Sequence, residues 1–109
     1  MVNPWWILAI AILLELSGTV CLKLSHGFSR LLPSIGVVFL YLGSFSLMSF
    51  SLKTLEVGIV YAIWSGVGTA LIAVVGVLAF GESITLSKIL GLLMIVGGTF
   101  LLRMASTPA

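Results

Sequence analysis

Hydrophobic residues in this chain fall in four long stretches, separated by short segments that hold most of the polar and charged side chains. Residues 4–22 contain one charged side chain, and residues 31–52 and 57–81 contain none. About 20 apolar residues in a helix cross the hydrocarbon core of a bilayer, which is roughly 30 Å thick. Each of these three stretches is therefore long enough to span a membrane.

The fourth stretch, residues 89–102, is shorter, and it spans the core only if Lys88 and Arg103 extend to opposite interfaces. The whole pattern predicts an all-α membrane protein with four transmembrane helices and a single membrane domain over residues 1–109. The expected helices cover approximately residues 4–25, 33–52, 57–80 and 86–104.

Residues that favour turns and helix ends lie between these stretches. Pro33 suits the first turn of a helix, where its missing N–H is not needed. Gly81 is placed to end the third helix, and Thr85 to cap the fourth. Short connections of this kind leave no room for a soluble domain.

Composition excludes several classes of protein. The chain is 61% hydrophobic and 7% charged, whereas a soluble domain is near a quarter charged. The apolar runs do not alternate with polar residues, so a β-barrel is not expected. No basic cluster is present to bind nucleic acid. With one histidine and one cysteine in no ligand spacing, we expect no metal, no cofactor and no enzymatic activity.

Basic residues give almost no preference for one membrane orientation. With four spans, Lys53 and Arg103 lie on one side, and Lys23, Arg30 and Lys88 on the other. Under the positive-inside rule, two against three is nearly no bias. The balance permits insertion in both orientations, and with it an antiparallel pair of identical chains.

Glu15 is the one charged residue inside a predicted span. It follows Pro4 by eleven residues, which places it about 16 Å along a helix, close to the centre of the bilayer. A carboxylate at that depth costs several kcal/mol to insert, so such residues usually serve a function. The structural alternative is a neutral acid that is hydrogen-bonded to a neighbouring helix.

Small and polar residues share the helix face of Glu15. Ala11 and Gly18 are expected to leave room beside the carboxylate, and Thr19 offers a hydroxyl group. Small residues also let helices approach closely, so the same face is equally suited to packing.

The third predicted helix carries an aromatic face formed by Tyr61, Trp64, Ser65 and Gly68. An indole and a phenol near a carboxylate suit an organic cation, which is attracted by charge and by the aromatic rings. Anchoring at the interface and core packing are the alternative roles for these aromatic residues.

Glycines in the third and fourth predicted helices indicate bending or close packing. Gly66 and Gly68 lie mid-membrane and favour a hinge, although glycines there also admit a neighbouring helix. Gly91 and Gly98 are seven residues apart on one face of the fourth helix, which is typical of a helix–helix contact.

Taken in order, these motifs make the chain resemble the small multidrug resistance family of bacterial transporters over nearly its whole length. The motifs are Asn3-Pro4, Glu15 with Gly18-Thr19, Lys23, Gly27-Phe28-Ser29-Arg30, Pro33-Ser34, Tyr41, Ser44-Phe45, Gly58, Tyr61-Ala62-Ile63-Trp64-Ser65-Gly66-Val67-Gly68, Gly91 and Gly98.

The resemblance implies a proton-coupled exporter in the prokaryotic inner membrane that acts as an antiparallel homodimer. Glu15 would bind either protons or a hydrophobic cation, with Trp64 and Tyr61 lining the pocket and Thr19 close to it. Trp5 stands where the family usually has a tyrosine that closes one side of the pocket. Gly91 and Gly98 match the dimer contact of the fourth helix.

Subtypes of the family differ next to the glutamate. Exporters of guanidinium-type metabolites tend to have tryptophan and alanine where this chain has Gly18-Thr19. The Gly-Thr pair resembles instead the branch that exports quaternary ammonium compounds. On this basis Gly18→Trp is expected to exclude bulky substrates while leaving proton binding intact. Departures from the family pattern at His26, Ser46 and Glu56-Val57 leave a paired heterodimer open.

Two alternatives follow. The chain could export guanidinium, polyamines or other metabolic cations. It could also be a small structural or regulatory membrane subunit in which Glu15 only holds helices together.

Overall fold

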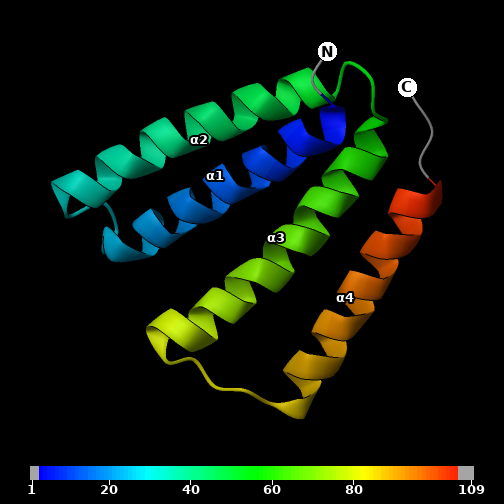
Figure 1. Cartoon of the computed structure of the whole chain (residues 1–109). Coiled ribbons are helices and arrows are strands. Elements are labelled where there is room, and N and C mark those ends of the chain that lie inside the picture. The colour runs from blue at the N-terminus through cyan, green and yellow to red at the C-terminus, as the bar shows by residue number, and fades with distance from the viewer. Residues whose placement is uncertain (1–2, 106–109) are drawn as a thin grey trace. The chain divides into compact units, whose positions relative to one another are not determined.

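The computed structural model describes residues 3–105, and this part of the chain is entirely helical apart from its connections. Four helices follow one another: α1 (Pro4–Leu24), α2 (Leu31–Ser51), α3 (Val57–Phe80) and α4 (Leu86–Ala105) (Figure 1). The prediction of an all-α protein with four spans is confirmed. Helix α2 begins two residues earlier than expected, at Leu31.

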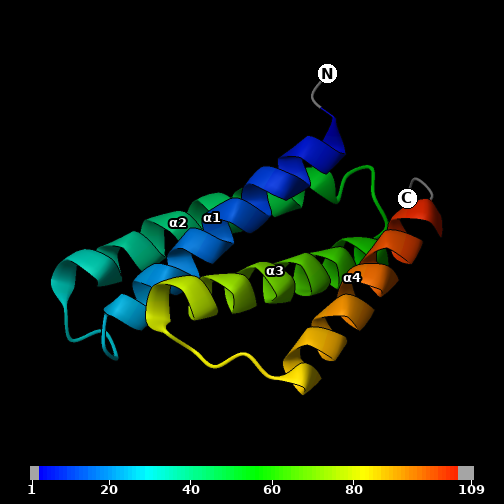
Figure 2. The ribbon, with the colours of Figure 1, turned by 60° about the horizontal axis from the view of Figure 1, so that its bottom comes forward.

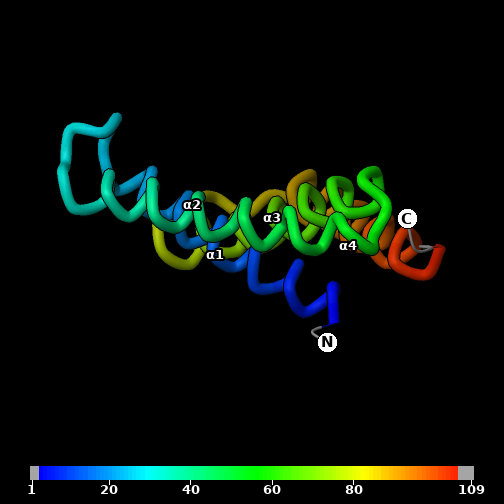
Figure 3. Tube along the Cα trace, turned by 90° about the horizontal axis from the view of Figure 1, so that it is seen from above, coloured from blue at the N-terminus to red at the C-terminus, as the bar shows by residue number. Residues whose placement is uncertain are grey.

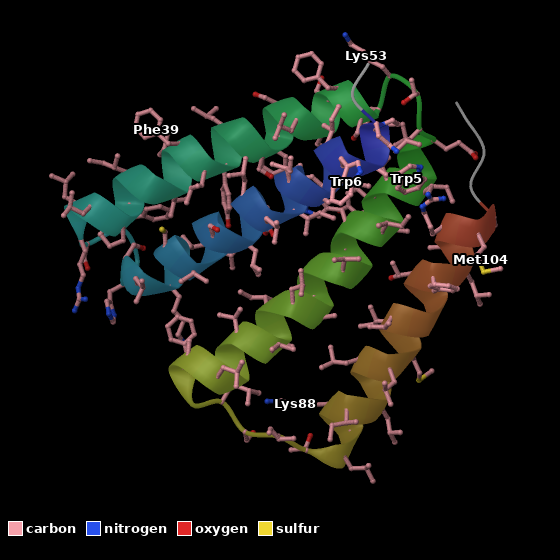
Figure 4. The ribbon with its side chains drawn as sticks, in the orientation of Figure 1. Trp5, Trp6, Phe39, Lys53, Lys88 and Met104 are labelled. Atoms are coloured by element: carbon pink, nitrogen blue, oxygen red, sulfur yellow. The ribbon has the colours of Figure 1, made fainter. Side chains whose placement is uncertain are left out.

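All four helices are long and apolar enough to cross a membrane. They contain 20 to 24 residues each, which corresponds to about 30 Å or more at a rise of 1.5 Å per residue. Large apolar side chains are exposed along every helix, for example Phe39 at 70% and Leu78 at 80%. Figure 4 shows Phe39 pointing outward from α2. Lipid chains are the solvent that such surfaces require.

The helices form two compact units that divide between Thr54 and Leu55, and each unit is a helical hairpin. The first unit pairs α1 with α2, and the two helices run side by side in both Figure 1 and Figure 3. The second unit pairs α3 with α4. In Figures 1 and 2 these two helices are farther apart near the segment that joins them than at their other ends.

Helix α1 begins with a proline at its first position, and the Asn3 side chain accepts a hydrogen bond of 2.9 Å from the backbone N–H of Trp5. The helix ends at Leu24, and the residue that caps it, Ser25, is fully buried. The Ser25 hydroxyl donates to Leu22 O and accepts from the N–H of Phe28. These bonds hold a tight connection to α2.

Small residues and polar pairs join α1 to α2. The Ser44 hydroxyl donates to the backbone oxygen of Ala11 at 2.7 Å, and both residues are fully buried. Farther along, Cys21 lies against Gly36, where an added Cβ would be 3.0 Å from its sulfur. Close backbone approach at small residues is how helices pack without a hydrophobic driving force in lipid.

The ends of α3 and α4 confirm the turn residues expected from the sequence. Gly81 adopts a left-handed conformation with φ of 65° and ends α3. The Thr85 hydroxyl accepts a hydrogen bond from the N–H of Lys88 and caps α4. The Lys88 ammonium reaches back to donate to Ser83 O at 2.6 Å, toward the segment between the helices (Figure 4).

Helices α3 and α4 are in contact where Gly66 faces Thr99. A Cβ added at Gly66 would collide with the Thr99 hydroxyl, which itself donates to Ile95 O. Toward the connecting segment a cavity of ≈ 440 Å³ lies between the two helices. Its lining is mostly apolar and includes Val77 and Leu92.

Candidate functional site around Glu15

Glu15 lies near the middle of α1 and is partly buried. The helix around it is apolar, because the other charged residue of α1 is Lys23 in the last turn. Lys23 follows Glu15 by eight residues, or about 12 Å along the axis. The carboxylate therefore has no neighbouring charge on its own helix.

A hydroxyl group on the next turn binds the carboxylate. Thr19 Oγ1 donates to Glu15 Oε1 at 2.9 Å, as expected for residues four apart on one helix face. Thr19 Oγ1 is also 2.8 Å from the Tyr41 hydroxyl, and in that bond either oxygen is able to donate. A carboxylate, an alcohol and a phenol thus form a continuous chain from α1 to α2.

The Tyr41 ring is held in place from several directions. It lies directly over Gly18, where an added Cβ would be 2.5 and 2.6 Å from the ring carbons Cε1 and Cδ1. Its ring also meets Phe45, one turn further along α2, edge to face at 6.0 Å. Glycine at position 18 lets this ring approach the α1 backbone.

This packing bears on the two roles that the sequence left open for the Glu15 face, room beside the carboxylate and close helix packing. The sequence suggested that Gly18 and Ala11 leave room beside Glu15, but the space over Gly18 is filled by Tyr41 and Ala11 is fully buried against α2. The physical reason is that a glycine facing another helix accepts a side chain from that helix.

Tyr41 and Ser44 are the residues whose roles the sequence did not reveal. Both were noted as motif positions, but nothing in the spacing along α2 showed that they would meet α1. The available signal was that Gly18 and Thr19 share the face of Glu15. A small residue and a hydroxyl group on one face call for a side chain of matching shape and a hydrogen-bond partner on a neighbouring helix.

The aromatic residues expected near the site lie on α3, in the second unit. Tyr61 is 67% exposed, Trp64 is partly buried, Ser65 is exposed and Gly68 is buried. Helix α3 is continuous through Gly66 and Gly68. In the first unit, Glu15 thus lies together with Thr19, Gly18 and Tyr41, whereas the aromatic face of α3 belongs to the second unit.

Two other groups of predicted residues lie at helix surfaces. Trp5 is partly buried in the first turn of α1 (Figure 4). Gly91 and Gly98 have no atom within 4 Å of an added Cβ among the residues that the structure describes. Gly98 is exposed and Gly91 lines the cavity between α3 and α4, so no side chain of the described structure packs onto either glycine of this face.

Residues 3–105 contain no group of three His, Cys, Asp or Glu side chains that could hold a metal ion. The site around Glu15 holds one carboxylate with two hydroxyl partners, Thr19 directly and Tyr41 through Thr19.

The family model of the Small Multidrug Resistance protein matches residues 3–95. The chain belongs to this family. The resemblance inferred from the ordered motifs is therefore confirmed. The chain is a multi-pass protein of the bacterial inner membrane, and its relatives are transporters.

Three relatives show how closely the chain follows the family. It is 47% identical over 102 residues to the multidrug resistance protein EbrB of Bacillus atrophaeus, covering 94% of this chain and 87% of that protein. It is 41% identical over 104 residues to the multidrug transporter EmrE of Escherichia coli, covering 95% and 94%. It is 43% identical over 102 residues to the guanidinium exporter of Proteus vulgaris, covering 94% and 98%.

Proposed function

We propose that this Small Multidrug Resistance protein exports hydrophobic and quaternary ammonium cations in exchange for protons, with Glu15 as the shared binding site. The observation that carries the proposal is a carboxylate near the middle of an apolar spanning helix, with Thr19 donating to it at 2.9 Å. Ionisable groups at that depth are costly and usually mark a proton or substrate pathway.

Competition for one carboxylate couples the two fluxes. An ionised Glu15 attracts a cation, whereas a protonated Glu15 does not, so a proton and a substrate exclude each other. If the site faces one side of the membrane at a time, proton entry drives cation exit. Two inverted copies of a chain provide the inverted repeat on which alternating access is commonly built.

Two features support an antiparallel homodimer. Basic residues are divided nearly evenly between the two sides, so one sequence is able to insert in both orientations. The glycine face of α4, with Gly91 and Gly98, is open to a second helix at close range. A heterodimer with a related chain would use the same face, and copurification of two differently tagged copies distinguishes the two assemblies.

For the substrate pocket we propose Trp64 and Tyr61 as the aromatic lining, with Ser65, Thr19 and Trp5 as further contacts. Aromatic faces bind a desolvated cation by about 2 kcal/mol or more, and they suit bulky delocalised cations better than small hydrated ones. Gly66 and Gly68 would supply flexibility to α3, since glycine weakens a helix by about 1 kcal/mol relative to alanine.

Relatives named for multidrug and for guanidinium export match this chain at similar identity, so identity does not separate the two substrate classes. The residue pair Gly18-Thr19 favours the first class, because it resembles the branch that exports quaternary ammonium compounds. In this structure, the tryptophan that guanidinium exporters tend to have at position 18 would collide with Tyr41. Gly18 and Tyr41 therefore fit each other. Export of guanidinium or polyamines is the second candidate function.

The test uses purified protein in liposomes with an inward-acid or an outward-acid pH gradient. A panel of cations from guanidinium to tetraphenylphosphonium is offered, and both cation uptake and proton flux are recorded. We expect coupled exchange of the bulky cations and its loss in Glu15→Gln, which remains inserted and helical. Normal coupled exchange by Glu15→Gln would refute the role of Glu15.

A further inference from the structure

The number of hydroxyl hydrogens on Thr19 and Tyr41 determines which oxygen donates in each hydrogen bond near Glu15. A threonine hydroxyl has one hydrogen to donate and two lone pairs, and a phenol likewise has one hydrogen. Thr19 gives its single hydrogen to Glu15 Oε1. In the bond between Thr19 and Tyr41, the phenol must then be the donor.

Protonation of Glu15 changes this arrangement. A neutral carboxylic acid carries an O–H that requires an acceptor in apolar surroundings, and Thr19 Oγ1 lies 2.9 Å away. If Thr19 accepts that proton, its own hydrogen turns toward the Tyr41 oxygen, 2.8 Å away. Tyr41 changes from donor to acceptor in this bond, and its own O–H hydrogen rotates away from Thr19.

We propose that Thr19 and Tyr41 form a hydrogen-bond relay whose direction reverses when Glu15 is protonated, so that α2 senses the charge on α1. The inference deepens the proposed function and rests on Glu15 being the site that gains and loses a proton. Tyr41 is a positioning residue here, because it acts on the carboxylate through Thr19.

The geometry supports a fixed relay. The Tyr41 ring is confined between the Gly18 backbone and Phe45, so its hydroxyl stays within reach of Thr19. Rotation of two hydroxyl hydrogens is enough to reverse the chain, and no helix has to move. Because the oxygens are already in place, the reversal requires no repacking.

No other titratable group of α1 or α2 takes the place of Tyr41 as the partner of Glu15 through Thr19. Tyr41 is the one titratable residue of α2. On α1, Cys21 packs against Gly36, and Lys23 lies two turns beyond Glu15 in the last turn. The polar partner that faces the carboxylate from α2 is therefore the phenol, through Thr19.

The relay favours the ionised form of Glu15. In that form each hydrogen points toward the negative charge, and hydrogen bonds to an ion are about twice as strong as neutral ones. Successive bonds in such a chain also strengthen one another. Removing a member therefore destabilises the ionised form more than the neutral form, and we expect variants that lack a member to bind a proton more tightly.

The experiment measures proton release from purified protein in detergent, without substrate and without a gradient. Thr19→Val keeps the shape and removes the hydroxyl, and we expect proton binding to tighten about tenfold. Tyr41→Phe should tighten it about threefold, and Thr19→Ser should stay close to the wild type. Ser17→Ala is the matched control, because the Ser17 hydroxyl bonds only to Leu13 O of its own helix in the described structure.

The double variant decides whether Tyr41 acts through Thr19. If it does, Thr19→Val with Tyr41→Phe binds protons like Thr19→Val alone, within about twofold. An additive effect of about thirtyfold would overturn the relay, because the two side chains would then act independently. Wild-type proton release in Thr19→Val would overturn it as well.

Infrared difference spectra give a readout that a purely structural role would not change. The chain has two tyrosines, so Tyr41→Phe and Tyr61→Phe assign the phenol C–O band of each. We expect the Tyr41 band to shift between donor and acceptor forms with the same pH midpoint as Glu15, and to stay constant in Glu15→Gln. A Tyr41 band that is constant across the titration of wild-type Glu15 would overturn the proposal.

The failures of the relay and of the transport function are distinguishable. Coupled export that is lost in Glu15→Gln, together with unchanged proton release in Thr19→Val, would refute the relay and leave the function intact. Normal export by Glu15→Gln, together with a Tyr41 band that follows Glu15, would refute the function and leave the relay intact.

Discussion

Gly18→Ala is the smallest change that tests how α1 and α2 fit together. The added Cβ would lie 2.5 Å from Tyr41 Cε1 and 2.6 Å from Cδ1, whereas carbon atoms in contact prefer about 3.5–4.0 Å. The ring has little freedom to move, because its hydroxyl bonds to Thr19 and its edge meets Phe45. Either the ring or the helix must shift by roughly 1 Å.

The expected magnitude follows from two opposing terms. Overpacking of this kind costs about 1–3 kcal/mol. Alanine favours a helix over glycine by up to about 1 kcal/mol, which offsets part of that cost. An overlap of roughly 1 Å against a ring that is held on two sides falls in the upper part of the overpacking range, so after the offset we expect Gly18→Ala to lower the free energy of unfolding by about 1–2 kcal/mol.

The assay is equilibrium unfolding of the purified protein in mixed micelles, followed by circular dichroism. Gly58→Ala is the matched control, because no atom lies within 4 Å of a Cβ added there, and it should be neutral or slightly stabilising. Tyr41→Ala in the Gly18→Ala background removes the overlap, so the double variant should be more stable than the sum of the two single changes predicts. Wild-type stability in Gly18→Ala would refute this account of the packing.

Three further predictions follow from the fold and the proposed function. Gly66→Ala should lower the free energy of unfolding by about 1–2 kcal/mol, after the same offset for helix propensity, because its Cβ meets the Thr99 hydroxyl; Thr99→Ala should restore part of it in the same assay. Two lysines added between α1 and α2 should force one orientation of a C-terminal reporter, and a reporter that stays distributed on both sides would contradict this. Tetraphenylphosphonium should displace a bound proton better than guanidinium at fixed pH, and Trp64→Phe should weaken its binding by about two- to fivefold; stronger displacement by guanidinium would favour the metabolite exporter.

The helices were predictable because a bilayer imposes simple rules on the sequence. Stretches without charge gave the spans, and residues with special backbone behaviour gave the ends. Gly81 adopts the left-handed conformation that ends α3, and Thr85 caps α4 as expected. The limits of α4 were the least constrained, because charges at Lys88 and Arg103 lie inside the helix rather than beyond it.

Contacts between helices were less predictable. Periodicity shows which residues share a face of one helix, but not which residue of a neighbouring helix lies opposite. The sequence therefore identified Glu15, Gly18 and Thr19 as one face, yet it did not show that Tyr41 covers Gly18 or that Thr99 faces Gly66. A glycine gives the same signal whether it admits a ligand, a bend or a neighbouring side chain.

Gly18→Trp is the substitution for which sequence and structure lead to different expectations. From the sequence alone, an indole at position 18 would exclude bulky cations and leave proton binding unchanged. In the structure, the space that an indole needs holds the Tyr41 ring, whose hydroxyl bonds to the threonine that binds Glu15. A residue large enough to displace that ring also separates Tyr41 from Thr19.

We therefore expect Gly18→Trp to tighten proton binding about threefold, in the same direction as Tyr41→Phe, as well as to exclude tetraphenylphosphonium. Proton release in detergent measures the first effect, and substrate competition in liposomes measures the second. In the Tyr41→Phe background, Gly18→Trp should add nothing further to proton binding, because the phenol hydroxyl is already absent. Wild-type proton release in Gly18→Trp, with bulky cations excluded, would show that substrate size is set at position 18 independently of the hydrogen bonds to Glu15.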